Sequence, residues 1–255
     1  MRIDVVTLFP ELVRSVARYG VTARAAERGV FTLATWDPRD ETTDVHRTVD
    51  DRPFGGGPGM VMKVQPVRAA LRRAAAAAPR GSRRIFLSPQ GRPLTQRALA
   101  GFARAPGLIL LAGRYEGIDE RVLEGEIDEE WSLGDYVLSG GELAAMAVID
   151  GVARLLPGGL GHEQSAAADT FSEDLLEGPQ YTRPEEIDGR RVPRVLVSGD
   201  HGAVERWRRK QALGRTWLRR PDLLEGRALT AHDRQLLEEF VAEHRGGAAV
   251  PDSEM

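Results

Sequence analysis

The chain has 255 residues, enough for one large or two moderate domains with separate cores, and we expect two. It contains no cysteine, which excludes disulfides and thiolate metal sites, and no apolar run approaches the roughly 20 residues of a membrane-spanning helix. The formal net charge is −3, which excludes a uniformly basic nucleic-acid-binding protein, although a basic segment can still bind phosphates locally.

The N-terminal part of the chain alternates between strand and helix patterns. Residues 3–9 carry Asp4 inside an apolar run, so they predict a strand rather than a signal peptide, and we expect a cytoplasmic protein without a membrane partner. Strands that alternate with helices indicate an α/β fold, with a parallel sheet covered on both faces. The further predicted elements are helices over Pro10–Arg28, Gln65–Ala78 and Leu94–Ala103, and strands over Phe31–Trp36, Arg84–Leu87 and Leu108–Leu111.

The C-terminal part has a different pattern. Glu142–Leu155 predicts a helix, whereas Gly161–Glu186 lacks apolar periodicity apart from a short helical pattern at Phe171–Leu176. Two more helices are predicted over Val204–Leu213 and Ala231–His244. We therefore expect a first domain over residues 1–160, a linker over 161–186, a small, mainly helical second domain over 187–246 and a disordered tail over 247–255.

Three loops that contain glycine or proline follow strand-like runs, namely Leu87–Gly91, Gly113–Gly117 and Leu133–Gly141. In a parallel sheet, ligands bind outside the carboxyl ends of the strands, so these loops can converge on one pocket. Neither G-x-G-x-x-G nor G-x-x-x-x-G-K-[ST] occurs, so a Rossmann nucleotide site and a P-loop are not supported. The pattern fits ordinary strand-to-helix turns as well as it fits a ligand pocket.

Two further features have purely structural explanations. Arg154 follows Asp150 by four residues in a predicted helix, which is the spacing of a surface ion pair. Asp169 precedes Thr170–Glu173, a segment that fits a capping box at the start of a short helix. No two histidines have the spacing of metal ligands, so no zinc site is predicted.

Charge is strongly segregated along the chain. Between Arg190 and Arg220 there are ten Arg and Lys residues and only two acidic ones. Arginines in such a segment neutralise phosphates, and exposed tryptophans can stack on bases. For the arginines we favour RNA binding, whereas Trp207 and Trp217 fit the core of a small domain better than they fit base stacking.

Five segments together resemble a known family, the bacterial tRNA (guanine-N1-)-methyltransferases that modify position 37, which are members of the SPOUT superfamily. The resemblance runs from the first strand to about His244. The segments that carry it are His46–Met60, Gly113–Arg121, Gly134–Glu142, Tyr181–Pro184 and Leu213–Pro221.

The resemblance implies an α/β domain with a deep trefoil knot, an exception to the rule that chains avoid threading. It also implies a helical tRNA-binding domain and a homodimer whose two active sites are shared between subunits. S-adenosylmethionine would lie in a bent shape among the knot loops. Its implied contacts are Pro89, Gly113, Glu116, Leu133, Gly134, Asp135, Tyr136, Val137, Leu138, Gly140 and Gly141.

The same resemblance implies that Asp169 is the general base and that Arg154 is its partner. Guanine N1 carries a proton that must leave while negative charge grows on O6, so the reaction needs both a base and a cation. An aspartate with a pKa near about 3.9 is a poor base for so weak an acid, and an arginine beside O6 would offset this by stabilising the developing charge. The family's reaction is also expected to use Mg²⁺, for which the sequence reveals no ligand set.

The target base must be turned out of the anticodon stack, which costs a few kcal/mol that contacts with tRNA repay. The expected RNA contacts are the loop from Asp50 to Gly59 together with Arg208, Arg209, Lys210, Arg215, Arg219 and Arg220.

Two alternatives remain beside N1 methylation of guanine. One is a related enzyme that methylates ribose 2′-hydroxyls, and the other is a non-catalytic RNA-binding module. The chain also departs from the family's usual pattern at a few positions, of which Ala144 is expected to loosen a helix start and Asp200 to weaken a polar contact. The other departures are Ala112 and Thr170.

Overall fold

The computed structural model describes residues 1–160, 170–171 and 174–247. The chain forms two compact units, Met1–Ala166 and Ala167–Met255. Asp169 lies outside the described residues, as do the rest of 161–169 and residues 172–173 of the expected linker, and 248–255 of the expected tail.

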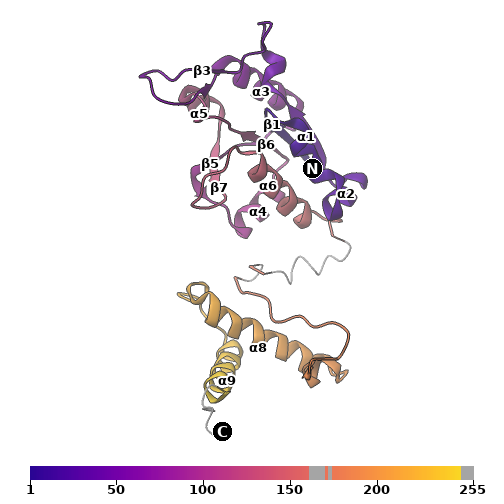
Figure 1. Cartoon of the computed structure of the whole chain (residues 1–255). Helices are drawn as coiled ribbons and strands as arrows, with labels where there is room; N and C mark the ends of the chain where they lie inside the picture. Colours follow the sequence, from indigo (N-terminus) through magenta and orange to yellow (C-terminus); the bar gives the residue numbers. More distant parts are fainter. Residues whose placement is uncertain (161–169, 172–173, 248–255) are drawn as a thin grey trace. The chain divides into compact units, whose positions relative to one another are not determined.

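The first unit is built on a parallel sheet, as the alternation of strands and helices predicts (Figure 1). Among the described residues this sheet has five strands in the order β2-β1-β6-β5-β7. Because β6, β5 and β7 are neighbouring parallel strands, the loops that follow them emerge side by side at the same edge of the sheet. The strands are β1 (Arg2–Val6), β2 (Thr32–Trp36), β5 (Arg83–Pro93), β6 (Gly107–Ala112) and β7 (Glu129–Ser132).

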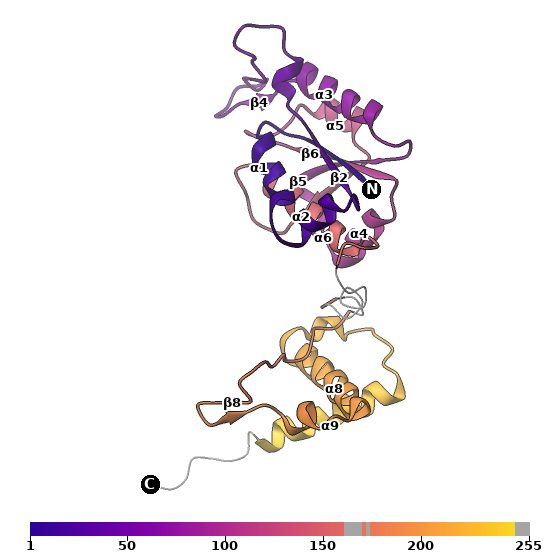
Figure 2. The same cartoon turned by 90° about the vertical axis from the view of Figure 1, so that its right-hand side faces the viewer.

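Helices cover both faces of this sheet (Figure 2). In β6, Leu108 and Leu110 belong to one apolar core, while Ile109 and Leu111 belong to the other, because successive side chains of a strand point to opposite faces. The first core contains residues of α1 (Pro10–Arg14), α2 (Gly20–Glu27), α4 (Gln96–Ala103) and α6 (Glu142–Leu155), and the second contains residues of α3 (Val64–Ala77) and α5 (Glu120–Glu126).

The predicted helix over Pro10–Arg28 is wrong in one respect, because the chain breaks it into three pieces. Between α1 and α2 lies a short 3-10 helix, Ser15–Arg18. Tyr19 is then extended (φ −137°) and Gly20 is left-handed (φ +66°), a conformation that glycine adopts without steric cost. The turn leaves the Tyr19 side chain 76% exposed.

The predicted loop over Leu87–Gly91 is an irregularity within β5. Both Leu87 and Arg92 pair with Trp131 of β7, so the four residues between them are extra on the β5 side. Gly91 passes directly against the Trp131 backbone, where a Cβ atom would collide. The extra residues therefore protrude at the carboxyl end of the sheet.

A polar excursion, residues 37–60, separates β2 from α3. It carries β3 (Asp50–Asp51), which pairs antiparallel with β4 (Val61–Met62). Met62 also bridges to Ile118 after β6, and the Met62 amide donates to the Gly117 carbonyl (2.9 Å). The excursion is thus attached at its base to the loop that follows β6.

The second unit is mainly helical, as predicted. A short hairpin of β8 (Glu186–Ile187) and β9 (Arg190–Arg191) precedes α8 (His201–Arg219) and α9 (Ala231–Gly247). The two helices pack closely where Gly214 faces the ring of Phe240, since a Cβ atom on Gly214 would overlap that ring. Leu175, Leu213 and Leu236 form the core.

Two departures from the family's usual pattern have a place in this structure. Asp200 caps α8, because its side chain accepts a hydrogen bond from the Ala203 amide (3.0 Å), and aspartate caps helices as well as asparagine does. Ala144 is buried in the first turn of α6, which begins at Glu142 as predicted.

Candidate active site

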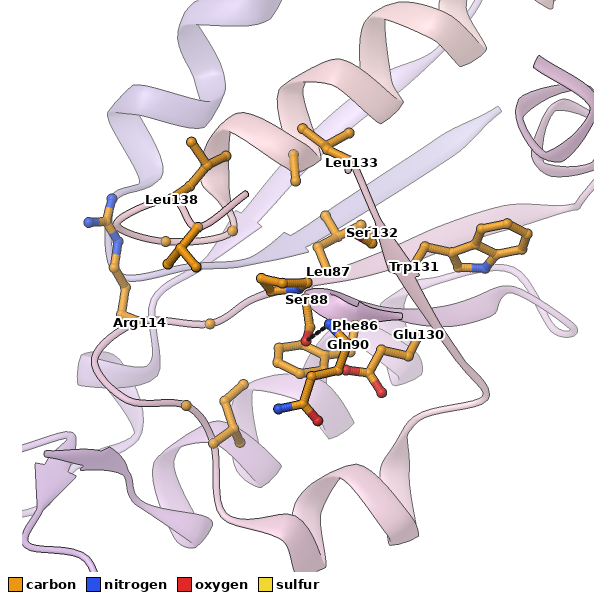
Figure 3. A pocket seen from close by; sticks show the side chains of 18 of the residues that line it. Phe86, Leu87, Ser88, Gln90, Arg114, Glu130, Trp131, Ser132, Leu133 and Leu138 are labelled. Atoms are coloured by element: carbon orange, nitrogen blue, oxygen red, sulfur yellow. Dashed lines mark hydrogen bonds between the residues drawn. The ribbon is translucent and has the colours of Figure 1, made fainter. Parts of the chain in front are cut away.

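A pocket of about 540 Å³ lies where β5, β6 and β7 end (Figure 3). Its walls come from the three predicted loops. Ser88 and Gln90 lie on the β5 irregularity, where the Gln90 amide donates to Ser88 Oγ (3.1 Å). Leu133 and Leu138 come from the loop after β7, and Arg114 from the loop after β6.

Most of the residues expected at a methyl-donor site line this pocket. The one that does not is Asp135. Those that do are Pro89, Gly113, Glu116, Leu133, Gly134, Tyr136, Val137, Leu138, Gly140 and Gly141.

The loops after β6 and β7 are joined backbone to backbone. The Gly141 amide donates to the Gly113 carbonyl (2.9 Å), and a Cβ atom on Gly141 would lie 2.8 Å from Ala112 Cα. Gly141 has φ −77°, which any residue adopts, so its need for glycine is steric rather than conformational. The pocket therefore depends on two bare backbone segments in contact.

A buried polar group at this junction was not among the expected site residues. Glu142 is fully buried, and its carboxylate accepts hydrogen bonds from Arg114 Nε (2.9 Å) and Thr7 Oγ1 (2.9 Å). Arg114 also donates to the Ser139 carbonyl (3.0 Å). Sequence patterns do not reveal this pairing, because 28 residues separate Arg114 from Glu142.

The excursion over residues 37–60 reaches the same loop. The Glu116 amide donates to the Met60 carbonyl (2.9 Å), and the Glu116 side chain lies where a Cβ atom of Gly59 would be. Burial raises the pKa of the Tyr115 hydroxyl, and the nearby Asp50 carboxylate raises it further. Asp50 and Gly59, expected to contact RNA, are thus neighbours of the Gly113–Gly117 loop that borders the pocket.

Of the two expected catalytic residues, the structure describes Arg154 but not Asp169. Arg154 is half-buried in the last turn of α6 and does not line the pocket. Asp169 lies outside the described residues, as does Glu173 of the expected capping box.

The six cations expected to bind RNA divide into two groups. Three are paired with carboxylates, Arg209 with Asp233 (2.8 Å), Lys210 with Glu243 (2.6 Å) and Arg220 with Asp222 (2.6 Å). For the other three, no ion pair forms with residues that the structure describes. These are Arg208, Arg215 and Arg219.

The two tryptophans of the basic segment pack within the second unit. Trp207 lies 6.3 Å from Tyr181 and Trp217 lies 6.2 Å from His244, both measured between ring centroids. Both side chains are half-buried, and neither is among the residues of the apolar core around Leu175, Leu213 and Leu236, so their place in the core stays a prediction.

Residues 1–226 match the family model described as tRNA (Guanine-1)-methyltransferase TrmD. The chain belongs to this family. The tRNA (guanine-N(1)-)-methyltransferase of Halorhodospira halophila is 64% identical over 97% of this chain and 94% of its own length. The enzyme of the same name from Methylococcus capsulatus is 62% identical over 95% of this chain and 97% of its own length.

A third TrmD-family relative, the tRNA (guanine-N(1)-)-methyltransferase of Proteus mirabilis, is 60% identical over 96% of this chain and 98% of its own length. The TrmD family belongs to the SPOUT superfamily and uses S-adenosylmethionine, so the resemblance seen in the five segments is confirmed. The comparisons support neither a ribose methyltransferase nor a non-catalytic RNA-binding module.

Among the described residues, no helix has both the length and the apolar character of a membrane-spanning segment. Over the same ranges, no three His, Asp or Glu side chains gather as metal ligands, so no residues are identified that would hold the expected Mg²⁺.

Proposed function

We propose that this protein transfers a methyl group from S-adenosylmethionine to N1 of the guanine at position 37 of tRNA. The single observation that carries the proposal is the pocket at the carboxyl ends of β5, β6 and β7, lined by nearly all the residues that the family resemblance assigns to the methyl donor. About 60% identity to named relatives over nearly the whole chain supports the same reaction.

The residues of the pocket fit this donor. The volume of about 540 Å³ lies within the range of small-molecule sites. Apolar side chains such as Leu133 and Leu138 suit an adenine ring, and the bare backbone at Gly140 and Gly141 lets a ligand approach peptide groups closely. S-adenosylmethionine, when bound, supplies an electrophilic methyl group on a sulfonium.

Two residues of the chain are proposed to remove the guanine proton and to stabilise the charge that its loss creates. Asp169 accepts the proton from N1, and Arg154 stabilises the negative charge that grows on O6. Without such a cation the aspartate would be badly mismatched as a base, since each unit of pKa difference costs about 1.4 kcal/mol.

Two surfaces are proposed to hold the tRNA. On α8, Arg208, Arg215 and Arg219 are the cations most available to phosphates, because Arg209, Lys210 and Arg220 already pair with carboxylates. The loop from Asp50 to Gly59 is the second surface and borders the Gly113–Gly117 loop of the pocket.

A trefoil knot and a homodimer with shared active sites complete the proposal. The backbone junction between Gly141 and Gly113 is compatible with a knotted crossing of the two loops. Exposed apolar side chains on α1 and α6, which pack together, support a dimer contact there: Leu12 is 39% exposed and Leu143 51%. We expect the protein to act in the cytoplasm, with Mg²⁺ as a cofactor.

Calorimetric titration with S-adenosylmethionine tests the assignment of the pocket. Gly141→Ala places a Cβ atom against Ala112, an overpacking of about 1–3 kcal/mol, and should weaken donor binding about tenfold to a hundredfold. Gly125→Ala is the matched control, because Gly125 lies on α5 with no atom near its Cβ position. Equal affinities for both variants would show that the donor binds elsewhere.

A further inference from the structure

Glu142 is the most deeply buried carboxylate near the pocket, and the proposed chemistry gives it no role. Its side chain is 1% exposed, yet both oxygens have partners within the first unit. Burial of an ionised group is costly unless it is paired and hydrogen-bonded, so a carboxylate here needs a compensating arrangement. Glu142 has one, because it is also the first residue of α6, where the helix dipole favours negative charge.

The partners of Glu142 come from three separate parts of the chain. Thr7 follows β1 and donates to Oε1 (2.9 Å), while its own Oγ1 accepts from the Phe9 amide (2.9 Å). Arg114 follows β6 and donates to Oε2 (2.9 Å). The same guanidinium reaches the Ser139 carbonyl (3.0 Å) and lies 4.4 Å from the centroid of the Phe9 ring.

Two hydrogen bonds from different nitrogens of its guanidinium therefore hold Arg114 in one orientation. Its Nε binds Glu142 and its Nη1 binds Ser139, which fixes the plane of the guanidinium across the turn of residues 139–141. Gly140 lies directly beneath it, since a Cβ atom there would overlap Arg114 Nε. Arg114, Ser139 and Gly140 all line the pocket, whereas Glu142 and Thr7 do not.

We infer that Glu142 is a positioning residue for the methyl-donor pocket. Its carboxylate holds Arg114 against Ser139 and Gly140, and so keeps the loop after β7 docked on the loop after β6. It also neutralises Arg114, whose charge would otherwise face a cationic sulfonium donor uncompensated. This inference rests on the proposed donor site.

The test is Glu142→Gln, which keeps the size of the side chain but removes the charge. Calorimetry should show that S-adenosylmethionine and its thioether product S-adenosylhomocysteine both bind at least about tenfold more weakly, with the larger loss for the cationic donor. In steady-state kinetics the KM for the donor should rise, while the KM for tRNA should change less than about twofold.

Asp4→Asn is the matched control. Like Glu142, Asp4 is a fully buried carboxylate that is paired with an arginine. It accepts hydrogen bonds from Arg2 (2.8 Å) and from Trp36 Nε1 (2.9 Å). It lies within β1, however, and does not line the pocket. This variant should lower the thermal midpoint of unfolding and leave both affinities within about twofold of wild type. Equal losses of affinity in the two variants would mean that Glu142 acts only through general stability.

Thr7→Val extends the test in case Glu142→Gln folds poorly. It removes one hydrogen bond to Glu142 without touching the pocket, and it should weaken donor binding by about threefold. The effects of the two substitutions should be non-additive, because both act through one carboxylate. Unchanged affinity in both variants, alongside a weakened Gly141→Ala, would overturn this inference while leaving the donor site in place.

Discussion

At the scale of single residues, the proposed site depends on glycines, whose lack of a Cβ atom leaves room for neighbouring groups. Gly141 and Gly59 show two different reasons for this. Gly141 has an ordinary backbone conformation and is required only because Ala112 is in contact. Gly59 is left-handed (φ +80°) and in addition leaves its Cβ position to the side chain of Glu116.

Gly59→Ala should therefore lower kcat/KM for tRNA methylation at least about tenfold, because it displaces Glu116 as well as straining the backbone. Gly55→Ala separates the two effects, since Gly55 has nearly the same φ (+85°) and no atom near its Cβ position. We expect that variant to lose less than about threefold. Equal losses would assign the effect to loop conformation alone.

Asp169→Ala should abolish methyl transfer while S-adenosylmethionine still binds, because the base meets the guanine and not the donor pocket. Single-turnover kinetics and calorimetry measure the two properties separately. A parallel fall of donor affinity and rate would contradict the role of Asp169 as a base.

At the scale of elements, how well a segment could be predicted depends on which side chains are buried. Glu142–Leu155 was predicted with the observed bounds because its apolar residues recur at helical spacing and are buried. Helix α8 begins before Val204 and continues past Leu213. The predicted helix stops at Leu213 because Arg215, the buried but polar Thr216 and Arg219 interrupt the apolar pattern beyond it.

Elements that bury little were missed for the same reason. No bounds were predicted for β7, an edge strand with two glutamates, or for α5, which buries only Val122. The carboxyl-end loops were predicted because glycine marks them directly. Glu142 was not assigned to the site, since its role depends on residues 28 and 135 positions away.

The pairing of the cations on α8 leads to a salt-dependence prediction. Arg208→Ala, Arg215→Ala and Arg219→Ala should each weaken tRNA binding and reduce the slope of log affinity against log salt by about 1. Lys210→Ala should change the slope less, because Lys210 already pairs with Glu243. Filter binding over a range of salt concentrations measures this. A slope that falls equally for Lys210→Ala would remove the distinction between paired and available cations.

The contact between α8 and α9 leads to a pH prediction. A hydrogen bond from Arg209 lowers the pKa of the Asp233 carboxyl, so this pair stabilises the folded unit above the unfolded pKa of about 3.9 and the contribution is lost as pH falls through the lower folded value. Asp233→Asn should therefore destabilise α8 and α9 at pH 7 but progressively less as the solution is acidified below about pH 4. Hydrogen exchange of peptides from both helices reports this difference. A gap that is independent of pH would contradict it.

At the scale of the whole molecule, the alternation of strands and helices predicts the fold class. The sequence of one chain does not by itself show whether two copies associate. Light scattering should give about twice the chain mass of 27.9 kDa. Leu143→Arg should shift the protein toward monomers and lower methylation, because Leu143 is an exposed apolar residue on α6. A stable monomer with full activity would contradict shared active sites.

Identification of the methylated nucleoside is the decisive measurement for the proposed reaction. The purified protein is incubated with S-adenosylmethionine and an unmodified tRNA transcript that carries guanine at position 37, and the RNA is then digested to nucleosides for mass analysis. We expect 1-methylguanosine from this transcript and none from a transcript with adenine at position 37. A 2′-O-methylated nucleoside, or no methylated nucleoside at all, would contradict it.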